Sequence, residues 1–77
     1  MSEVVYVECY SGHTYAQEPH ALIARGERRV VTAVERSWQT PDGPRFLVRT
    51  EDGGEYLLEY DVASDRWLAT EKRKSKT

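Results

Sequence analysis

The stretch PDGPRFLVRTEDGGEYLLEY, residues 41–60, decides the fold class of this chain. It holds two glycine turns, PDG at 41–43 and EDG at 51–53, each set between segments in which apolar and charged residues alternate. A third turn, RGE at 25–27, lies upstream. Glycine supplies the positive φ that hairpin loops require, and alternation with a period of two is typical of half-buried strands. The three turns therefore predict an antiparallel meander.

The EDG turn predicts a register that sorts the side chains onto two faces. With three residues in the loop, Arg49 pairs with Glu55 and Val48 pairs with Tyr56. Charges then meet on one face and apolar residues meet on the other, and a slip of one residue would destroy both matches. The residues expected on the buried face are Trp38, Phe46, Val48, Tyr56, Leu58, Tyr60 and Trp67.

The other two turns predict pairings of the same kind. A three-residue loop at PDG places Arg49 between Glu35 and Glu55, and a two-residue turn in RGE with glycine first pairs Leu22 with Val31. We expect an all-β fold, an antiparallel meander of five to six strands. Because a flat sheet would leave its apolar face in water, we expect it to be strongly curved into a small half-open barrel-like sheet.

Length and composition indicate the class of protein. At 77 residues the chain is near the lower limit for one core. The alternation ends near residue 70, so we expect a single all-β domain at 1–70 and a charged, disordered tail at 71–77. The chain has one cysteine, no basic and apolar leader, and no run of roughly 18 apolar residues. These features predict a cytoplasmic protein without a membrane contact.

The sequence contains no recognisable pattern for metal binding or catalysis. Its one cysteine and two histidines, Cys9, His13 and His20, lack the paired spacing of zinc ligands. A cysteine–histidine nucleophile would need an orienting group and a pocket, and nothing indicates either one. Acid pairs such as Glu59 and Asp61 are expected to be solvated strand residues. We therefore expect no enzyme, no metal site and no cofactor.

Arg36 breaks the alternation. A strict alternation places it on the apolar face opposite Val48, where an unpaired guanidinium would be costly. Three arrangements remain open: a bulge that turns Arg36 outward, a side chain laid along Trp38 to the rim, or an exposed arginine–tryptophan binding site. If the domain binds a partner, we expect the binding site at the end of the sheet that carries Arg36, Trp38, Tyr60 and Trp67.

Two classes of function fit these features. The first is a small non-catalytic interaction or accessory module that binds a protein partner or forms a homodimer through its sheet. The alternative is a nucleic-acid-binding small β-barrel that uses the arginine-rich strands between residues 25 and 49. Residues 1–70 carry seven arginines against twelve acidic residues, a net charge of −5, which disfavours binding driven by phosphate contacts. The aromatic platform of that alternative would comprise Tyr6, Trp38, Phe46, Tyr56, Tyr60 and Trp67.

The turn and core positions form a string of short motifs, RGER at 25–28, FLVRTEDG at 46–53, YLLEYD at 56–61 and DRW at 65–67. This string resembles a family of small all-β bacterial domains of unknown function, and the likeness covers about residues 8–68. Members of that family often carry an aromatic pair where this chain has Ala24 and Arg29. The resemblance implies an all-β fold, and it implies no activity.

Overall fold

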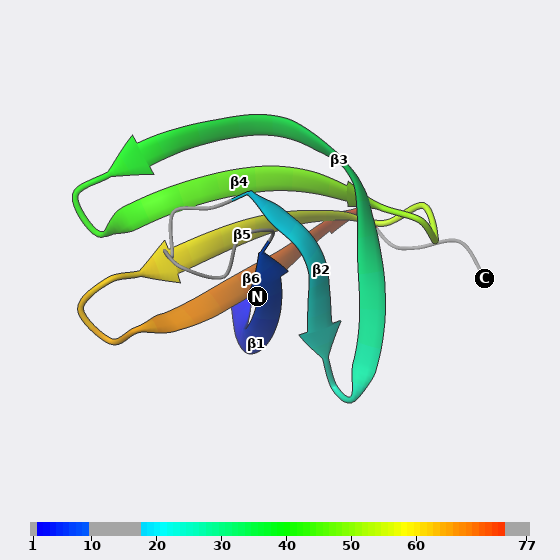
Figure 1. Ribbon diagram of the computed structural model, residues 1–77, viewed down its shortest axis with the longest axis horizontal. Helices are drawn as coiled ribbons and strands as arrows, with labels where there is room; N and C mark the ends of the chain where they lie inside the picture. Colours follow the sequence, from blue (N-terminus) through cyan, green and yellow to red (C-terminus); the bar gives the residue numbers. More distant parts are fainter. Residues whose placement is uncertain (1, 10–17, 74–77) are drawn as a thin grey trace.

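The computed structural model describes residues 2–9 and 18–73, which form six β-strands and the turns between them. The strands are β1 (Ser2–Cys9), β2 (Pro19–Ala24), β3 (Glu27–Thr40), β4 (Gly43–Thr50), β5 (Glu55–Asp61) and β6 (Arg66–Arg73). Each strand pairs antiparallel with the next, and β1 also pairs with β6, so the sheet is a closed barrel (Figure 1). The all-β meander and its strong curvature are confirmed. The sheet curves far enough to close completely, whereas a half-open sheet was expected.

The first strand closes the barrel by changing its partner in the middle. Its first half pairs with β6, where Val5 lies opposite Trp67, and its second half pairs with β2, where Tyr6 lies opposite Ile23. In Figure 1, β1 therefore lies between β6 and β2. Because residues alternate along a strand, Val5 points inward with the core and its neighbours Val4 and Tyr6 point outward.

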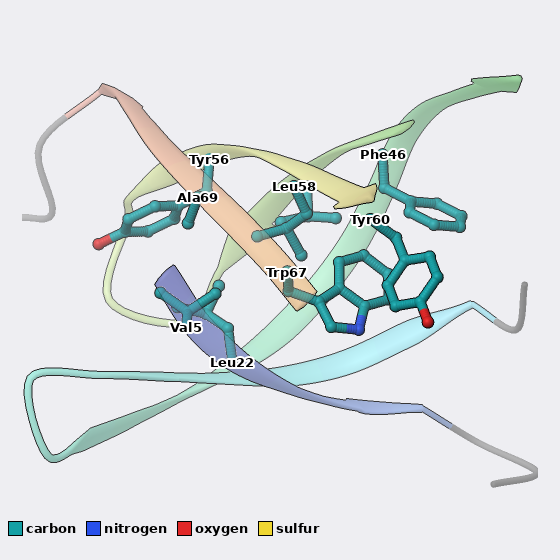
Figure 2. Packing of buried hydrophobic residues seen from close by; sticks show 9 residues of the cluster. Val5, Leu22, Phe46, Tyr56, Leu58, Tyr60, Trp67 and Ala69 are labelled. Carbon is teal, nitrogen blue, oxygen red and sulfur yellow. The ribbon is translucent and has the colours of Figure 1, made fainter. Parts of the chain in front are cut away.

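The inward faces of the strands fill the barrel (Figure 2). Leu58 and Val48 are fully buried members of this core, and so is Leu22 from β2. The predicted pairing of β4 with β5 and of β5 with β6 is confirmed, including Arg49 with Glu55. The predicted core residues that the structure confirms are Phe46, Val48, Tyr56, Leu58, Tyr60 and Trp67.

Trp38 was also predicted to be buried, and that prediction is wrong: 42% of its surface is exposed. The β3–β4 turn contains two residues rather than three, so Trp38 pairs with Arg45 in place of Phe46 and points outward. Gly43 therefore belongs to β4, with a φ of +145°. A Cβ atom at Gly43 would lie 2.1 Å from the carbonyl oxygen of Tyr60, so this packing requires glycine at that position.

Two irregularities in the pairing of β3 with β4 place Arg36. They lie between Val31 and Ala33 and between Val34 and Arg36. The second is a bulge that turns Arg36 outward, opposite Leu47, which is the first of the three arrangements left open by the sequence. Val31 packs against the core. The bulges let β3 follow the curvature of the barrel while its apolar residues stay inside.

The predicted pairing of Leu22 with Val31 is wrong by two residues. The β2–β3 turn consists of Arg25 and Gly26, with φ values of +53° and +78°, and this places Leu22 opposite Arg29. Two positive φ values make a turn whose twist matches that of the strands. A shift of two residues preserves the faces, so Leu22 stays inside and Arg29 points into the same end of the barrel.

The final strand continues three residues past the expected end of the domain at residue 70. Arg73 pairs with Glu55, and the hydroxyl of Tyr56 donates a hydrogen bond to Glu71 at 3.3 Å. The predicted tail at 71–77 therefore begins within β6, because cross-strand pairing and a hydrogen bond hold its first residues. Residues 74–77 of that tail lie outside the described residues.

Candidate functional site

The four residues selected from the sequence lie on opposite faces of the sheet. Tyr60 and Trp67 point into the barrel with their ring centroids 5.2 Å apart, and both are buried. Arg36 and Trp38 lie two residues apart on the outer face of β3, and both are exposed. The four residues therefore form two separate pairs, one inside the barrel and one outside it, and not a single site.

The outer pair lies on a surface dominated by charges. Arg45, opposite Trp38, is held by Glu59 at 3.0 Å, and Arg49 is held by Glu35 at 2.7 Å. Among the described residues of β3, Trp38 is the one large apolar side chain that is strongly exposed. Arg36 and Trp38 therefore offer one aromatic contact and one cation, without a neighbouring apolar surface of similar exposure.

A second surface, which we call the β1 groove, lies along the outside of β1. It is a hollow of about 710 Å³ bordered by Val4, Tyr6, Ile23, Arg25, Ser64 and Arg66. The outward side chains of β1 form the floor, with 58% of Val4 and 78% of Tyr6 exposed. The β2–β3 turn and the β5–β6 turn project on either side of β1 in Figure 1 and supply the walls.

The floor of the β1 groove is apolar because of the composition of β1. On β4 and β5 the outward positions carry matched charges, such as Arg45 opposite Glu59. On β1 the outward positions carry Val4 and Tyr6, and Ile23 lies opposite Tyr6 on β2. Scattered exposed apolar residues are normal on a protein, but adjacent ones in a hollow are characteristic of a binding surface.

Arg66 is a cation on one wall of the β1 groove. It lies opposite Asp61, but that carboxylate accepts two hydrogen bonds from the turn that follows it, at 3.2 and 2.9 Å. The neighbouring Asp65 accepts a hydrogen bond from the hydroxyl of Tyr60. Within residues 2–9 and 18–73, Arg66 forms no ion pair. Its guanidinium is therefore available to a ligand.

Arg25 supplies a second cation on the opposite wall. It belongs to the β2–β3 turn, where its positive φ projects the residue at the end of the hairpin. Arg25 pairs with Glu3 at 3.1 Å, yet 82% of its side chain is exposed. An exposed pair of this kind is worth only about 0.2–1 kcal/mol, so Arg25 can exchange Glu3 for another carboxylate. The β1 groove is thus an apolar floor between two arginines.

A smaller hollow of about 290 Å³ lies at one mouth of the barrel. Arg29 lies inside it, with Nη1 3.0 Å from Glu27 and Nε 3.3 Å from Asp52. Tyr56 donates a hydrogen bond to Glu71 at 3.3 Å, and burial raises the pKa of Tyr56. Arg29 Nε, although it lies near Asp52, has no hydrogen-bond partner among the described residues, whereas the contacts with Glu27 and Glu71 pair the other polar groups named here.

The candidate soft ligands do not form a metal centre in the part of the chain that the structure describes. Cys9 ends β1, and His13 lies outside the described residues. His20 Nε2 lies 3.5 Å from the carboxylate of Glu8, which also binds Arg28 at 2.8 Å. The hydrogen bond from Arg28 lowers the pKa of Glu8. No three histidine, cysteine, aspartate or glutamate side chains gather as metal ligands among the described residues.

Sequence reasoning missed the β1 groove. The alternation pattern assigns Tyr6 only to an aromatic platform, and it does not single out Val4 or Ile23. The signal was the run VVYV at 4–7, in which consecutive apolar residues must occupy both faces of a strand. The structure also divides that platform: Tyr6 and Trp38 are exposed, whereas the buried members are Phe46, Tyr56, Tyr60 and Trp67.

Comparison with known proteins gives no relative from which a function could be transferred. No family model, no curated protein and no solved structure matches this chain. The resemblance to small bacterial domains therefore stays a prediction. Among the described residues, no helix has the length and apolar character needed to cross a membrane.

Proposed function

We propose that this domain is a small non-catalytic interaction module of the cytoplasm, which binds a protein partner through the β1 groove. One observation carries the proposal: 58% of Val4 and 78% of Tyr6 are exposed in a hollow of about 710 Å³. The core inside the barrel is complete without these side chains. Exposed apolar residues that the fold does not need are typical of interaction sites.

The chemistry of the β1 groove supports a binding role. Its walls supply two guanidinium groups, and none of its lining residues is a histidine or a cysteine. Arginine and tyrosine are the residue types most enriched among those that contribute strongly to protein interfaces. Tyr6 between Arg25 and Arg66 therefore matches the composition expected of a protein interface.

Nucleic-acid binding is the second candidate. Tyr6 could stack on a base while Arg25 and Arg66 contact phosphates, as in other single-strand-binding surfaces. Against it, two of the floor residues, Val4 and Ile23, are aliphatic, and residues 1–70 have a net charge of −5. Four of the six aromatic residues considered for a platform are buried. These features favour a protein partner.

Site-specific photo-crosslinking tests the proposal. A benzophenone amino acid at position 6 samples the β1 groove, and the same group at position 38 is the matched control on a second exposed aromatic residue. We expect one discrete protein adduct from position 6, which mass spectrometry identifies, and no adduct of that mass from position 38. An adduct of twice the chain mass would indicate a homodimer, and an adduct sensitive to nuclease would indicate nucleic acid.

The identified partner is then purified and titrated against the variants. Tyr6→Ser is expected to weaken binding by at least about 1 kcal/mol, since truncated interface anchors typically cost that much or more. Trp38→Ser is expected to bind like the wild type. The melting temperatures of both variants should stay close to that of the wild type, because both side chains are exposed. Weaker binding by Trp38→Ser alone would contradict the proposal.

A further inference from the structure

The chemistry of the β1 groove also indicates what occupies it, and this inference rests on the function proposed above. We infer that its ligand is an extended segment of a partner protein in which two apolar side chains at alternate positions are flanked by acidic residues. The inference combines three features of the groove: the spacing of the floor residues, the free charge on the walls, and the poor fit of the groove to a second copy of itself.

The floor matches an extended peptide. Val4 and Tyr6 lie two residues apart on the same face of β1, a separation of roughly 7 Å along a strand. An extended ligand has the same period, so every second side chain would face the floor. Ile23 beside Tyr6 widens the apolar contact. A hollow of about 710 Å³ lies within the ~300–1,000 Å³ range of ligand sites.

The walls select negative charge. Arg66 has no ion pair within the described part of the chain, and Arg25, on the opposite wall, forms an exposed ion pair with Glu3. Asp65 is the acidic residue that lines the groove, so two guanidinium groups face one carboxylate. The accessible charge is therefore positive, although residues 1–70 as a whole are acidic. Guanidinium groups bind carboxylates with two parallel hydrogen bonds, which favours aspartate or glutamate in the ligand.

A second copy of the chain is a poor occupant. A two-fold interface places the same patch of both copies face to face. Arg25 and Arg66 of one copy would then approach the same arginines of the other, and like charges across an interface are unfavourable. Each copy supplies one lining carboxylate, Asp65, against two arginines, so an interface between two copies would keep an excess of positive charge. A carboxylate from a different protein relieves this repulsion.

Selection from random peptides tests the inference without a known partner. The full chain is immobilised and used to select from a library of displayed linear peptides, and the selected peptides are synthesised and titrated. We expect them to share two apolar residues at alternate positions with aspartate or glutamate on both sides. Tyr6→Ser is expected to weaken their binding at least tenfold.

Charge reversal provides the matched control. Arg66→Glu should weaken the selected peptides at least tenfold and should shift a new selection toward lysine and arginine. Arg36→Glu makes the same change at an exposed arginine outside the groove, so it should have no such effect. Equal effects of the two reversals would overturn the inference, because only a general charge effect would then be present.

The remaining outcomes separate the inference from the function on which it rests. Selected peptides that lack acidic residues but still need Tyr6 would overturn the inference and leave the interaction module intact. If no peptide is enriched relative to the Tyr6→Ser chain, or if binding ignores that change, both are wrong. A labelled single-stranded oligonucleotide provides the last comparison. If it binds more tightly than the peptides, and if Arg66→Glu abolishes that binding, the groove binds nucleic acid instead.

Discussion

Truncation of the two tryptophans should affect stability very differently, and Trp67→Ala should have the larger effect. Trp67 is 9% exposed, and its ring lies 5.9 Å from that of Phe46 and 5.2 Å from that of Tyr60. Truncation of a buried tryptophan costs about 3–5 kcal/mol. A chain of 77 residues has a free energy of unfolding of about 4–12 kcal/mol, at roughly 0.05–0.15 kcal/mol per residue. Trp67→Ala should therefore remove a large part of the stability.

Trp38→Ala is the matched control, since it deletes the same side chain from the outer face. With 42% of its surface exposed, Trp38 should contribute much less than Trp67, and the expected cost is below about 1 kcal/mol. Urea titration followed by far-ultraviolet circular dichroism measures both changes independently of tryptophan emission. Equal costs would refute the register of β3 against β4, because they would place Trp38 in the core.

Tryptophan fluorescence tests the same assignment in folded variants. Trp67→Phe keeps an aromatic ring in the core and leaves Trp38 as the only emitter, whereas Trp38→Phe leaves Trp67. We expect emission at longer wavelength and stronger acrylamide quenching from Trp38, because water reaches its ring. The reverse order would contradict the outward position of Trp38.

Three further predictions concern a turn, a carboxyl pair and an arginine. Gly43→Ala should cost more than Gly26→Ala in urea titrations: a Cβ at Gly43 would lie 2.1 Å from a backbone oxygen, whereas at Gly26 nothing lies within 4 Å and only the positive φ is unfavourable, at about 1–2 kcal/mol. A hydrogen bond between the Glu35 and Glu55 carboxyls raises the pKa of Glu55 in the folded protein. The protonated Glu55 therefore stabilises the fold below the ordinary pKa of 4.5, and this stabilisation is lost as the pH rises through the raised pKa. The melting temperature of Glu55→Gln minus that of the wild type should therefore increase from acidic to neutral pH. A difference that does not change with pH would contradict the hydrogen bond between the two carboxyls. Arg36→Ala should leave the melting temperature unchanged, since Arg36 is exposed and has no ion pair among the described residues, and a large loss would contradict its outward position.

The glycine turns show what sequence patterns can and cannot predict. The EDG loop is as expected: Gly53 has a φ of +87°, and the Gly54 amide donates a hydrogen bond to Asp52 at 3.2 Å. The PDG segment has the same three-letter pattern but forms a shorter turn. Pro44 has no N–H with which to make the bond that Gly54 makes, and Gly43 packs against Tyr60. The first reason lies in the sequence, but the second depends on a strand 17 residues away.

The error at Trp38 has a related cause. Alternation predicts faces only while a strand pairs regularly, and β3 has two irregularities in its pairing with β4. Together with the shorter turn, they put Val34 inside and both Arg36 and Trp38 outside. The curvature that requires bulges is a property of the closed barrel, so residue types on β3 indicated a bulge at Arg36 only as one of three arrangements.

The first strand was the hardest to interpret from sequence because its role depends on closure. The run VVYV predicts a strand, but which face points inward is decided by β6, whose residues lie more than 60 positions away. Once Val5 lies opposite Trp67, Val5 and Val7 must face the core, and Val4 and Tyr6 must face water. The pairing of β1 with β6 therefore both closes the barrel and places the apolar side chains of Val4 and Tyr6 in the β1 groove. It follows that substitutions at positions 5 and 7 should act on the free energy of unfolding, whereas polar substitutions at positions 4 and 6 should act on binding. A strand that served only to close the sheet would gain solubility from polar residues at positions 4 and 6, and this is the physical reason to assign their apolar side chains to a partner.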